Sequence, residues 1–163
     1  FTSDHGYHLG EHDFWAKVSL LDESSQVPLI IRVPGKKPAV CHSLTELLDL
    51  YPTVSALCGL PSQSRLQGKD ISKMLDDPKH TVRTAAFSVA PMRSGFLLRE
   101  DEWAYIQYGE NGRKGIELYN IKKDPHQYTS LAQHPAHQKT VARFKAQMTG
   151  KLRNIRNNDL KGN

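Results

Sequence analysis

The sequence predicts an α/β protein whose last part is a small antiparallel sheet with a packed C-terminal helix. Three observations support this fold class. A near-continuous apolar run at residues 27–33, with prolines near both ends, is typical of a strand covered on both faces in a parallel sheet. From residue 85 onward, short alternating segments predict an antiparallel meander of about four strands. Near the C-terminus, apolar residues recur at helical spacing and predict an amphipathic helix.

Length and composition exclude several classes of protein. The chain has 163 residues, a formal net charge of +5 and 24% charged residues, which suits one domain with a sizeable core. No apolar run approaches the ~20 residues of a transmembrane helix, so we expect no membrane span. Much of the positive charge falls on the polar side of the C-terminal helix, and no basic-aromatic nucleic-acid motif is present. We therefore expect no nucleic-acid partner.

The predicted strand at residues 27–33 indicates that the chain is a fragment of a longer protein. A single buried strand cannot form a parallel sheet, so its partners are expected in an absent part. The chain also starts at Phe1, already inside a dense motif, so we expect the true N-terminus upstream. Without that part, residues 27–33 and the helix near residues 51–57 should lack their normal cover, and the fragment should be poorly soluble alone.

One helix is predicted in the first half of the chain. Its apolar pattern begins near Ser43, but Pro52 would break the interior of a helix that started there. We therefore place the start near Asp49 or Leu50, so that Pro52 lies in the first turn. Gly59 supplies the C-terminal stop.

In the second half of the chain, turn-forming residues mark where the predicted strands and helices begin and end. Residues 62–84 predict a loop with one short helix around residues 71–75. Four strand-like segments come next, AAFSVA, GFLLRE, EWAYIQYG and IELYNI, separated by turn-forming residues. A turn-rich connection then leads to the final helix, which Pro135 is suited to open from its first position.

The opening stretch TSDHGYHLGEHDFWAK, residues 2–17, concentrates side chains that bind metals and anions. If residues 1–3 finish a strand, Asp4 and His5 lie at its carboxyl end, and Gly6 lets the backbone turn sharply. A carboxylate and an imidazole at the mouth of an α/β sheet are suitable ligands for a divalent cation. Lys17 would add a fixed positive charge for an anionic substrate group.

Two other interpretations of this stretch concern His8 and His12. Their spacing suits one face of a helix and a zinc ion. However, Leu9 stands where a zinc-protease helix has Glu, and Gly10 weakens any helix between the histidines. The remaining interpretation is that both histidines only form hydrogen bonds within a loop.

The opening stretch, followed by VPLIIRVPG, resembles the C-terminal half of type I sulfatases of the alkaline phosphatase superfamily, in particular the iduronate-2-sulfatase-like branch. The resemblance continues through LLDLYPTVSALCGLP and LQGKDI to ELYNIKKDPHQYTSLA, so it covers nearly the whole chain in order. It implies an alkaline-phosphatase-like sulfatase fold. Residues 1–84 would form the C-terminal part of the catalytic α/β domain, and residues 85–163 a C-terminal subdomain.

The resemblance also implies site residues. Asp4 and His5 match the positions that complete the family's single metal site, usually calcium, where many relatives have Asp-Asn; the other ligands would lie outside this fragment. Lys17 matches the lysine that contacts the substrate's sulfate, and would be both a catalytic and a substrate-binding residue. His12 lies in the matching GEH segment, which implies a catalytic role lining the pocket.

The implied activity is hydrolysis of a sulfate ester in a small molecule or a glycan. The family's nucleophile is a formylglycine made from Cys in a C-x-P-S-R motif. Cys41 has no such context, and Cys58 has one residue too many before the proline. We therefore expect the nucleophile in the missing N-terminal part, which would be this chain's main partner, and no activity from the fragment alone.

The cellular location and two alternative functions can also be stated as expectations. The resemblance implies an exported protein, in the periplasm, outside the cell or in a lysosome, with the bacterial periplasm favoured. One rival is a phosphate or phosphonate ester hydrolase of the same superfamily, which can use a similar Asp-His-Gly segment. The other is a non-catalytic module that binds anions through its basic face.

Overall fold

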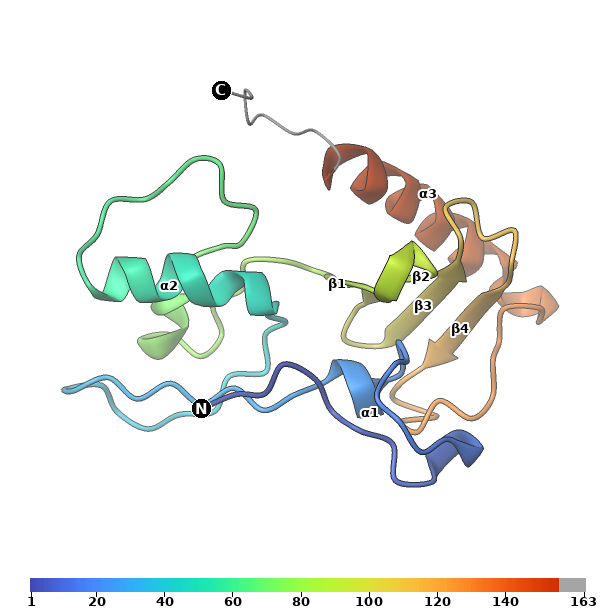
Figure 1. Ribbon diagram of the computed structural model, residues 1–163, viewed down its shortest axis with the longest axis horizontal. Helices are drawn as coiled ribbons and strands as arrows, with labels where there is room; N and C mark the ends of the chain where they lie inside the picture. Colours follow the sequence, from blue (N-terminus) through green and yellow to red (C-terminus); the bar gives the residue numbers. More distant parts are fainter. Residues whose placement is uncertain (156–163) are drawn as a thin grey trace. The chain divides into compact units, whose positions relative to one another are not determined.

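The computed structural model describes residues 1–155, and residues 156–163 lie outside the described part (Figure 1). The described residues form two compact units. The first consists of residues 1–30 and 87–155, and the second of residues 31–86. No helix within the described part has the length and apolar character that a membrane crossing requires.

A four-stranded sheet lies in the C-terminal half of the chain, as the alternating segments predicted. Its strands are adjacent in chain order: β1 (Ala86–Val89), β2 (Gly95–Arg99), β3 (Trp103–Tyr108) and β4 (Ile116–Asn120). β2 pairs antiparallel with β3, and β3 with β4, so that Tyr105 lies between Leu98 and Leu118. The turn between β3 and β4 uses three glycines with positive φ, a conformation that other residues rarely adopt.

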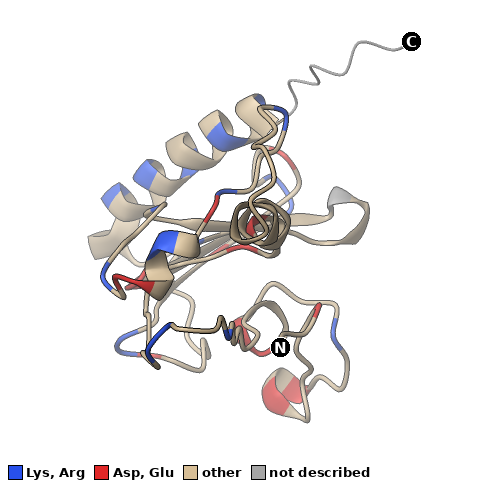
Figure 2. Ribbon diagram, turned by 90° about the vertical axis from the view of Figure 1, so that its left-hand side faces the viewer, with Lys and Arg blue, Asp and Glu red and all other residues tan. Residues whose placement is uncertain are grey.

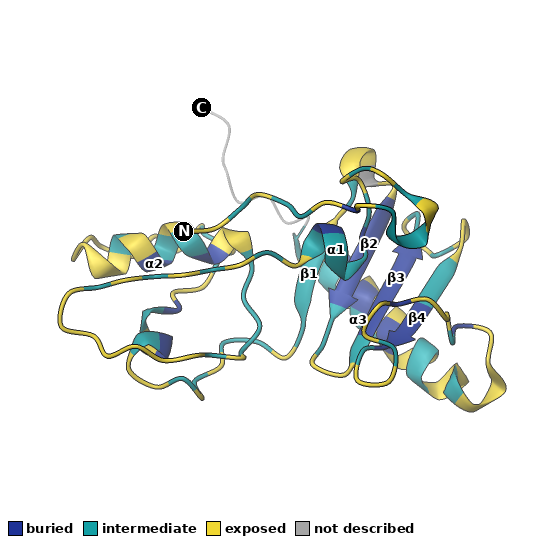
Figure 3. Ribbon diagram, turned by 90° about the horizontal axis from the view of Figure 1, so that it is seen from below, coloured by how far each residue is buried: buried dark blue, intermediate teal, exposed yellow. Residues whose placement is uncertain are grey.

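Both faces of this sheet are covered. Alternate side chains point to opposite faces of a strand. On one face, Phe144 of α3 (Gln138–Ile155) stacks on Tyr105, with ring centroids 5.4 Å apart. On the other face, Leu97 and Ile106 form a buried cluster with Leu20, which belongs to the N-terminal segment. Most of β2 and β3 is coloured as buried in Figure 3.

Helix α3 has the amphipathic character that its sequence predicted. Phe144, Met148 and Leu152 are buried, whereas the exposed positions carry several basic residues and no acidic one (Figure 2). Pro135 opens a short 3-10 turn, Pro135–His137, directly before the helix, rather than the helix itself. This difference is small, because both conformations accept proline at the first position.

The second unit contains α2 (Leu50–Leu57), which starts and ends where the prolines and Gly59 predicted. A 3-10 turn, Leu47–Asp49, precedes it, and another, Ser72–Leu75, lies where a short helix was expected. Several apolar residues on α2 and just before it are exposed, and much of α2 is coloured as exposed in Figure 3, in agreement with the expected lack of cover. They are Leu47, Leu48, Tyr51, Val54 and Leu57.

The predicted buried strand at residues 27–33 is wrong for this chain. Among the described residues, this segment forms only one isolated antiparallel bridge, between Leu29 and Thr2. It is flanked by backbone hydrogen bonds between Phe1 and Ile30, at 2.7 and 2.8 Å. Ile30 is 62% exposed. The apolar run remains extended, but a strand requires a continuous ladder of partners, and the first residues of the chain supply only this short contact.

The boundaries of the two compact units differ from the predicted domain boundary after residue 84. The first 30 residues pack with the sheet and α3, and residues 31–86 form a unit of their own. The predicted division into residues 1–84 and 85–163 describes the domains of a longer protein, and it stays a prediction.

Candidate functional site

The side chains of Asp4 and His5, the two predicted metal ligands, lie close together. Asp4 Oδ2 lies 3.6 Å from His5 Nε2, and both atoms can therefore reach a metal ion at the usual ligand distances of about 2.0 to 2.5 Å. His5 Nδ1 lies 2.8 Å from the carbonyl oxygen of Gly6. Because a carbonyl only accepts, Nδ1 donates, and the neutral ring keeps a lone pair on Nε2 for a metal.

This pair is open toward further ligands. The Asp4 side chain is 84% exposed. In residues 1–155, no group of three or more His, Cys, Asp or Glu side chains could hold a metal ion. A carboxylate oxygen and an imidazole nitrogen are suitable donors for a divalent cation, so this pair fits such an ion. That other ligands lie outside this chain stays a prediction.

Lys17 lies on a loop that closes on itself. The loop begins at His8, whose N–H donates to the carbonyl of Ala16 at 2.8 Å. At the other end of the loop, His8 Nε2 lies 2.7 Å from Ser19 Oγ, within hydrogen-bonding distance. Lys17 is exposed and forms no hydrogen bond or ion pair with any described residue. Its ammonium group is therefore available to an anion, although no such contact in the described part joins it to Asp4 or His5.

His12 turns toward the interior of the first unit. It lies in the left-handed region, with φ of 58°, inside a short 3-10 turn, Glu11–Asp13. Its Nε2 atom is 3.9 Å from Glu23 Oε1. Its ring packs against Tyr128, with centroids 4.9 Å apart, and against the edge of His8. The predicted role of His12 in lining a pocket is not tested by these contacts and stays a prediction.

The zinc interpretation of His8 and His12 finds no support. The two residues do not lie on a common helix, and the described part contains no metal-binding group of three. His8 is fully buried, with its ring against Ser19 and the edge of Phe14. For His8, the interpretation as a hydrogen-bonding loop residue is therefore confirmed.

A short helix that the sequence did not reveal supports both parts of this site. This helix, α1 (Asp22–Ser25), accepts a hydrogen bond from the Gly6 amide on its Ser24 carbonyl, at 2.9 Å. A Cβ atom at Gly6 would lie 2.0 Å from the Glu23 carbonyl oxygen, so the Asp4–His5 segment rests directly on the helix backbone. One turn is too short for hydrophobic periodicity, and only the acidic residues at its start hinted at a helix.

Two other carboxylates in this region, Glu11 and Asp22, form contacts of their own. The backbone N–H of Leu9 donates to Glu11 at 2.6 Å, and this hydrogen bond holds the pKa of Glu11 below its usual value. Asp22 of α1 forms an ion pair with Arg99 of β2, with Oδ2 and Nη2 3.0 Å apart. The carboxylates nearest α1 are therefore engaged in contacts of their own, which leaves Asp4 as the exposed acid next to His5.

Comparisons with known proteins agree with this description. The family described as N-sulphoglucosamine sulphohydrolase, C-terminal, matches residues 10–155. Arylsulfatase K of Danio rerio is 34% identical over 143 residues, which are 81% of this chain and 27% of that protein. The chain thus spans 27% of the length of this curated relative.

Solved structures are similar over almost the whole chain. One is described as a 2-O GAG sulfatase; it has a TM-score of 0.83 and 28% identity, and the match covers 96% of this chain and 36% of that one. Another is the phosphonate monoester hydrolase SpPMH from Silicibacter pomeroyi, with a TM-score of 0.81 and 25% identity, covering 98% of this chain and 35% of that one.

Proposed function

Because the chain belongs to the family of N-sulphoglucosamine sulphohydrolase C-terminal domains, we propose that the protein of which it forms part hydrolyses sulfate esters. The alkaline-phosphatase-like sulfatase fold expected from the opening motif is confirmed by the similarity to solved structures. The observation that carries the proposal is the pairing of Asp4 Oδ2 and His5 Nε2 at 3.6 Å, on the same short stretch as the exposed Lys17.

Asp4 and His5 would hold one divalent cation, calcium by resemblance, together with ligands outside this chain. When bound, such a cation stabilises negative charge that develops on the sulfuryl group. The hydrogen bond from His5 Nδ1 to Gly6 keeps the ring oriented with Nε2 toward the metal side. Lys17 would bind the sulfate oxygens and neutralise their charge as the ester bond breaks. A pocket-lining role of His12 is part of the same proposal.

The attacking group is proposed to lie outside this chain. Neither Cys41 nor Cys58 has the sequence context of a formylglycine precursor, and Asp4 and His5 supply only half of a metal site. The fragment alone would therefore be inactive, and its functional partner would be the N-terminal part of the same protein. An exported location, such as the bacterial periplasm, belongs to this proposal through the resemblance alone.

The substrate is proposed to be a sulfated small molecule or a sulfated glycan. The solved neighbour described as a 2-O GAG sulfatase supports the glycan class. Membership in an iduronate-2-sulfatase-like branch remains a finer proposal that rests on the opening motif. The second candidate function is phosphonate or phosphate ester hydrolysis, which the similarity to a phosphonate monoester hydrolase favours.

The test uses the full-length protein with 4-nitrophenyl sulfate and with a phenyl phosphonate ester. We expect sulfate-ester hydrolysis that disappears on metal removal and returns with calcium. Lys17→Ala should lower kcat/KM about 100-fold, whereas Lys139→Ala, an exposed lysine on α3, should leave it unchanged. Hydrolysis of the phosphonate ester alone would favour the second candidate. Hydrolysis of neither ester would favour the anion-binding module.

A further inference from the structure

Helix α1 holds both segments of the candidate site. The Gly6 amide, directly after Asp4 and His5, donates to the Ser24 carbonyl at 2.9 Å. The loop that carries Lys17 ends at Ser19, whose hydroxyl accepts from the amide of Leu21, the residue before the helix, at 3.2 Å. The position of Asp4 and His5 therefore depends on what holds α1 in place.

One side chain from the distant part of the chain holds the start of α1. No side chain of the preceding residue caps this helix. Instead, the Asp22 amide donates to Gln127 Oε1 at 2.7 Å, across 105 residues of sequence. Gln127 is only 1% exposed, so this hydrogen bond is shielded from water and is not easily replaced by solvent.

The backbone of Gln127 is held in an unusual conformation. Its φ is +57°, in the left-handed region that residues other than glycine rarely adopt. Asp124 holds this turn, because its carbonyl accepts from the Gln127 amide at 3.1 Å and its carboxylate accepts from the Thr129 amide at 2.8 Å. The Oε1 atom of Gln127 is thus presented to α1 by a turn with little freedom of its own.

The other half of the Gln127 amide, its NH2 group, is buried as well. Its Nε2 atom is buried and has no hydrogen-bond partner among the described residues. A buried donor without a partner is unfavourable, and an apolar side chain of similar shape would remove it. The same replacement would leave the Asp22 amide without the acceptor that Gln127 Oε1 supplies.

We propose that Gln127 is a positioning residue for the metal ligands Asp4 and His5. It fixes the first amide of α1, the helix fixes Gly6 through Ser24, and Gly6 fixes the two side chains before it. The ion pair between Asp22 and Arg99 supports the same helix from β2. This inference rests on the metal-binding role proposed above.

The experiment measures calcium binding directly in the full-length protein, by isothermal titration calorimetry on Gln127→Met. We expect calcium affinity about tenfold or more below the wild type, and a melting temperature of the calcium-free protein lowered by the loss of one buried hydrogen bond. Activity at limiting calcium should fall, and excess calcium should restore it. Gln133→Met, which changes an exposed glutamine, is the matched control and should bind calcium normally.

A second control separates affinity from stability. Ile106→Val trims the fully buried core of β3 and should lower the melting temperature without changing calcium affinity. If Gln127→Met fails to fold, Gln127→Asn, which keeps the amide but shortens its reach, is judged by the same criterion.

Three results decide the proposal. Calcium affinity of the position-127 variant within about twofold of the wild type would overturn it, because losing a group that orients metal ligands should cost about tenfold or more. A wild-type protein that binds no calcium would overturn it together with the metal site. A wild type that binds calcium but hydrolyses no sulfate ester, with weakened binding in the variant, would support it while the proposed function fails.

Discussion

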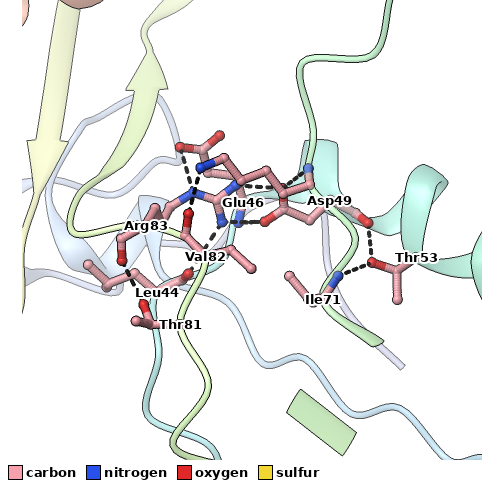
Figure 4. A network of polar contacts seen from close by, with 9 residues as sticks. Leu44, Glu46, Asp49, Thr53, Ile71, Thr81, Val82 and Arg83 are labelled. Atoms are coloured by element: carbon pink, nitrogen blue, oxygen red, sulfur yellow. Dashed lines mark hydrogen bonds and ion pairs between the residues drawn. The ribbon is translucent and has the colours of Figure 1, made fainter. Parts of the chain in front are cut away.

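Arg83 and Asp49 form a two-pronged ion pair inside the second unit, drawn in Figure 4. Arg83 Nη2 donates to Asp49 Oδ1 at 2.6 Å, and Nη1 donates to Oδ2. The side chain of Asp49 is fully buried and that of Arg83 is 7% exposed. Asp49 also accepts from the amides of Glu46 and Lys69. This carboxylate therefore ties together separate points of the unit.

Asp49→Asn should destabilise the protein strongly. It removes one of the two carboxylates beside the buried Arg83 guanidinium and leaves only Glu46, whose Oε1 atom lies 3.4 Å from Arg83 Nε. Breaking a buried pair from one side costs about 3 to 5 kcal/mol, and because Glu46 remains we expect the lower end of this range. Asp76→Asn is the control, because Asp76 pairs with Lys36 and is 66% exposed; that change should cost less than about 1 kcal/mol. Urea denaturation of the full-length protein measures both, and equal losses would contradict the central role of Asp49.

The contribution of Asp49 should disappear in acid. Burial tends to raise its pKa, but the hydrogen bonds from Arg83 and from two backbone amides outweigh burial and hold the pKa below the ordinary value of 3.8. A carboxyl whose pKa is lower in the folded state stabilises the protein above its unfolded pKa. That stabilisation is lost as the pH falls from about 4 through the folded pKa.

The pH effect is measured as the stability difference between wild type and Asp49→Asn at several pH values. We expect the difference to be constant from neutral pH to about pH 5 and to shrink below about pH 4. Carboxyl groups that are distant from Arg83 titrate alike in both proteins and cancel. A difference that stayed constant down to about pH 3, or that grew in acid, would mean that the pKa of Asp49 is not lowered by folding.

Gly6→Ala should weaken both the fold and the candidate site. The new Cβ would meet the Glu23 carbonyl oxygen at 2.0 Å, and neither backbone can move freely, so we expect a loss of about 1 to 3 kcal/mol. Gly150→Ala is the control, because nothing lies within 4 Å of its Cβ position and it lies inside α3. That change should stabilise the protein by about 0.5 to 1 kcal/mol. Thermal unfolding measures both, and a neutral Gly6→Ala would contradict the close packing on α1.

Phe144→Ala should release α3 from the sheet. Phe144 is fully buried against Tyr105, in nearly parallel stacking at an interplanar angle of 3°. Its truncation should cost about 3 to 5 kcal/mol. Lys145→Ala, next to it on the exposed side, should change stability by less than about 0.5 kcal/mol. Chemical denaturation measures the difference, and a loss below about 1 kcal/mol would mean that the helix is held elsewhere.

The parts of the fold with strong local signals could be predicted from the sequence. Pro52 and Gly59 marked both ends of α2, and the turn glycines marked the strands of the sheet. The extended run at residues 27–33 could not be judged correctly, because an apolar stretch predicts a strand only if partners are present. Helix α1 was missed because a single turn has no period and is held by tertiary contacts.

The candidate site shows the same limit. Asp4 and His5 are adjacent in sequence, so the closeness of their side chains could be predicted, whereas their joint use for one cation stays a proposal. The direction of His12 could not, because it depends on a left-handed turn and on Glu23 and Tyr128. Gln127 carried no signal at all, since its hydrogen bond to Asp22 joins residues 105 positions apart.

The first unit joins the two ends of the described chain, with residues 31–86 between them. Its assembly therefore requires long-range contacts, which form late and slowly in folding. During synthesis, Asp4 and His5 leave the ribosome about a hundred residues before the residues that support them, which lie from β2 to Gln127. The segment proposed to bind the metal thus receives its supporting contacts only after the chain has been made as far as Gln127.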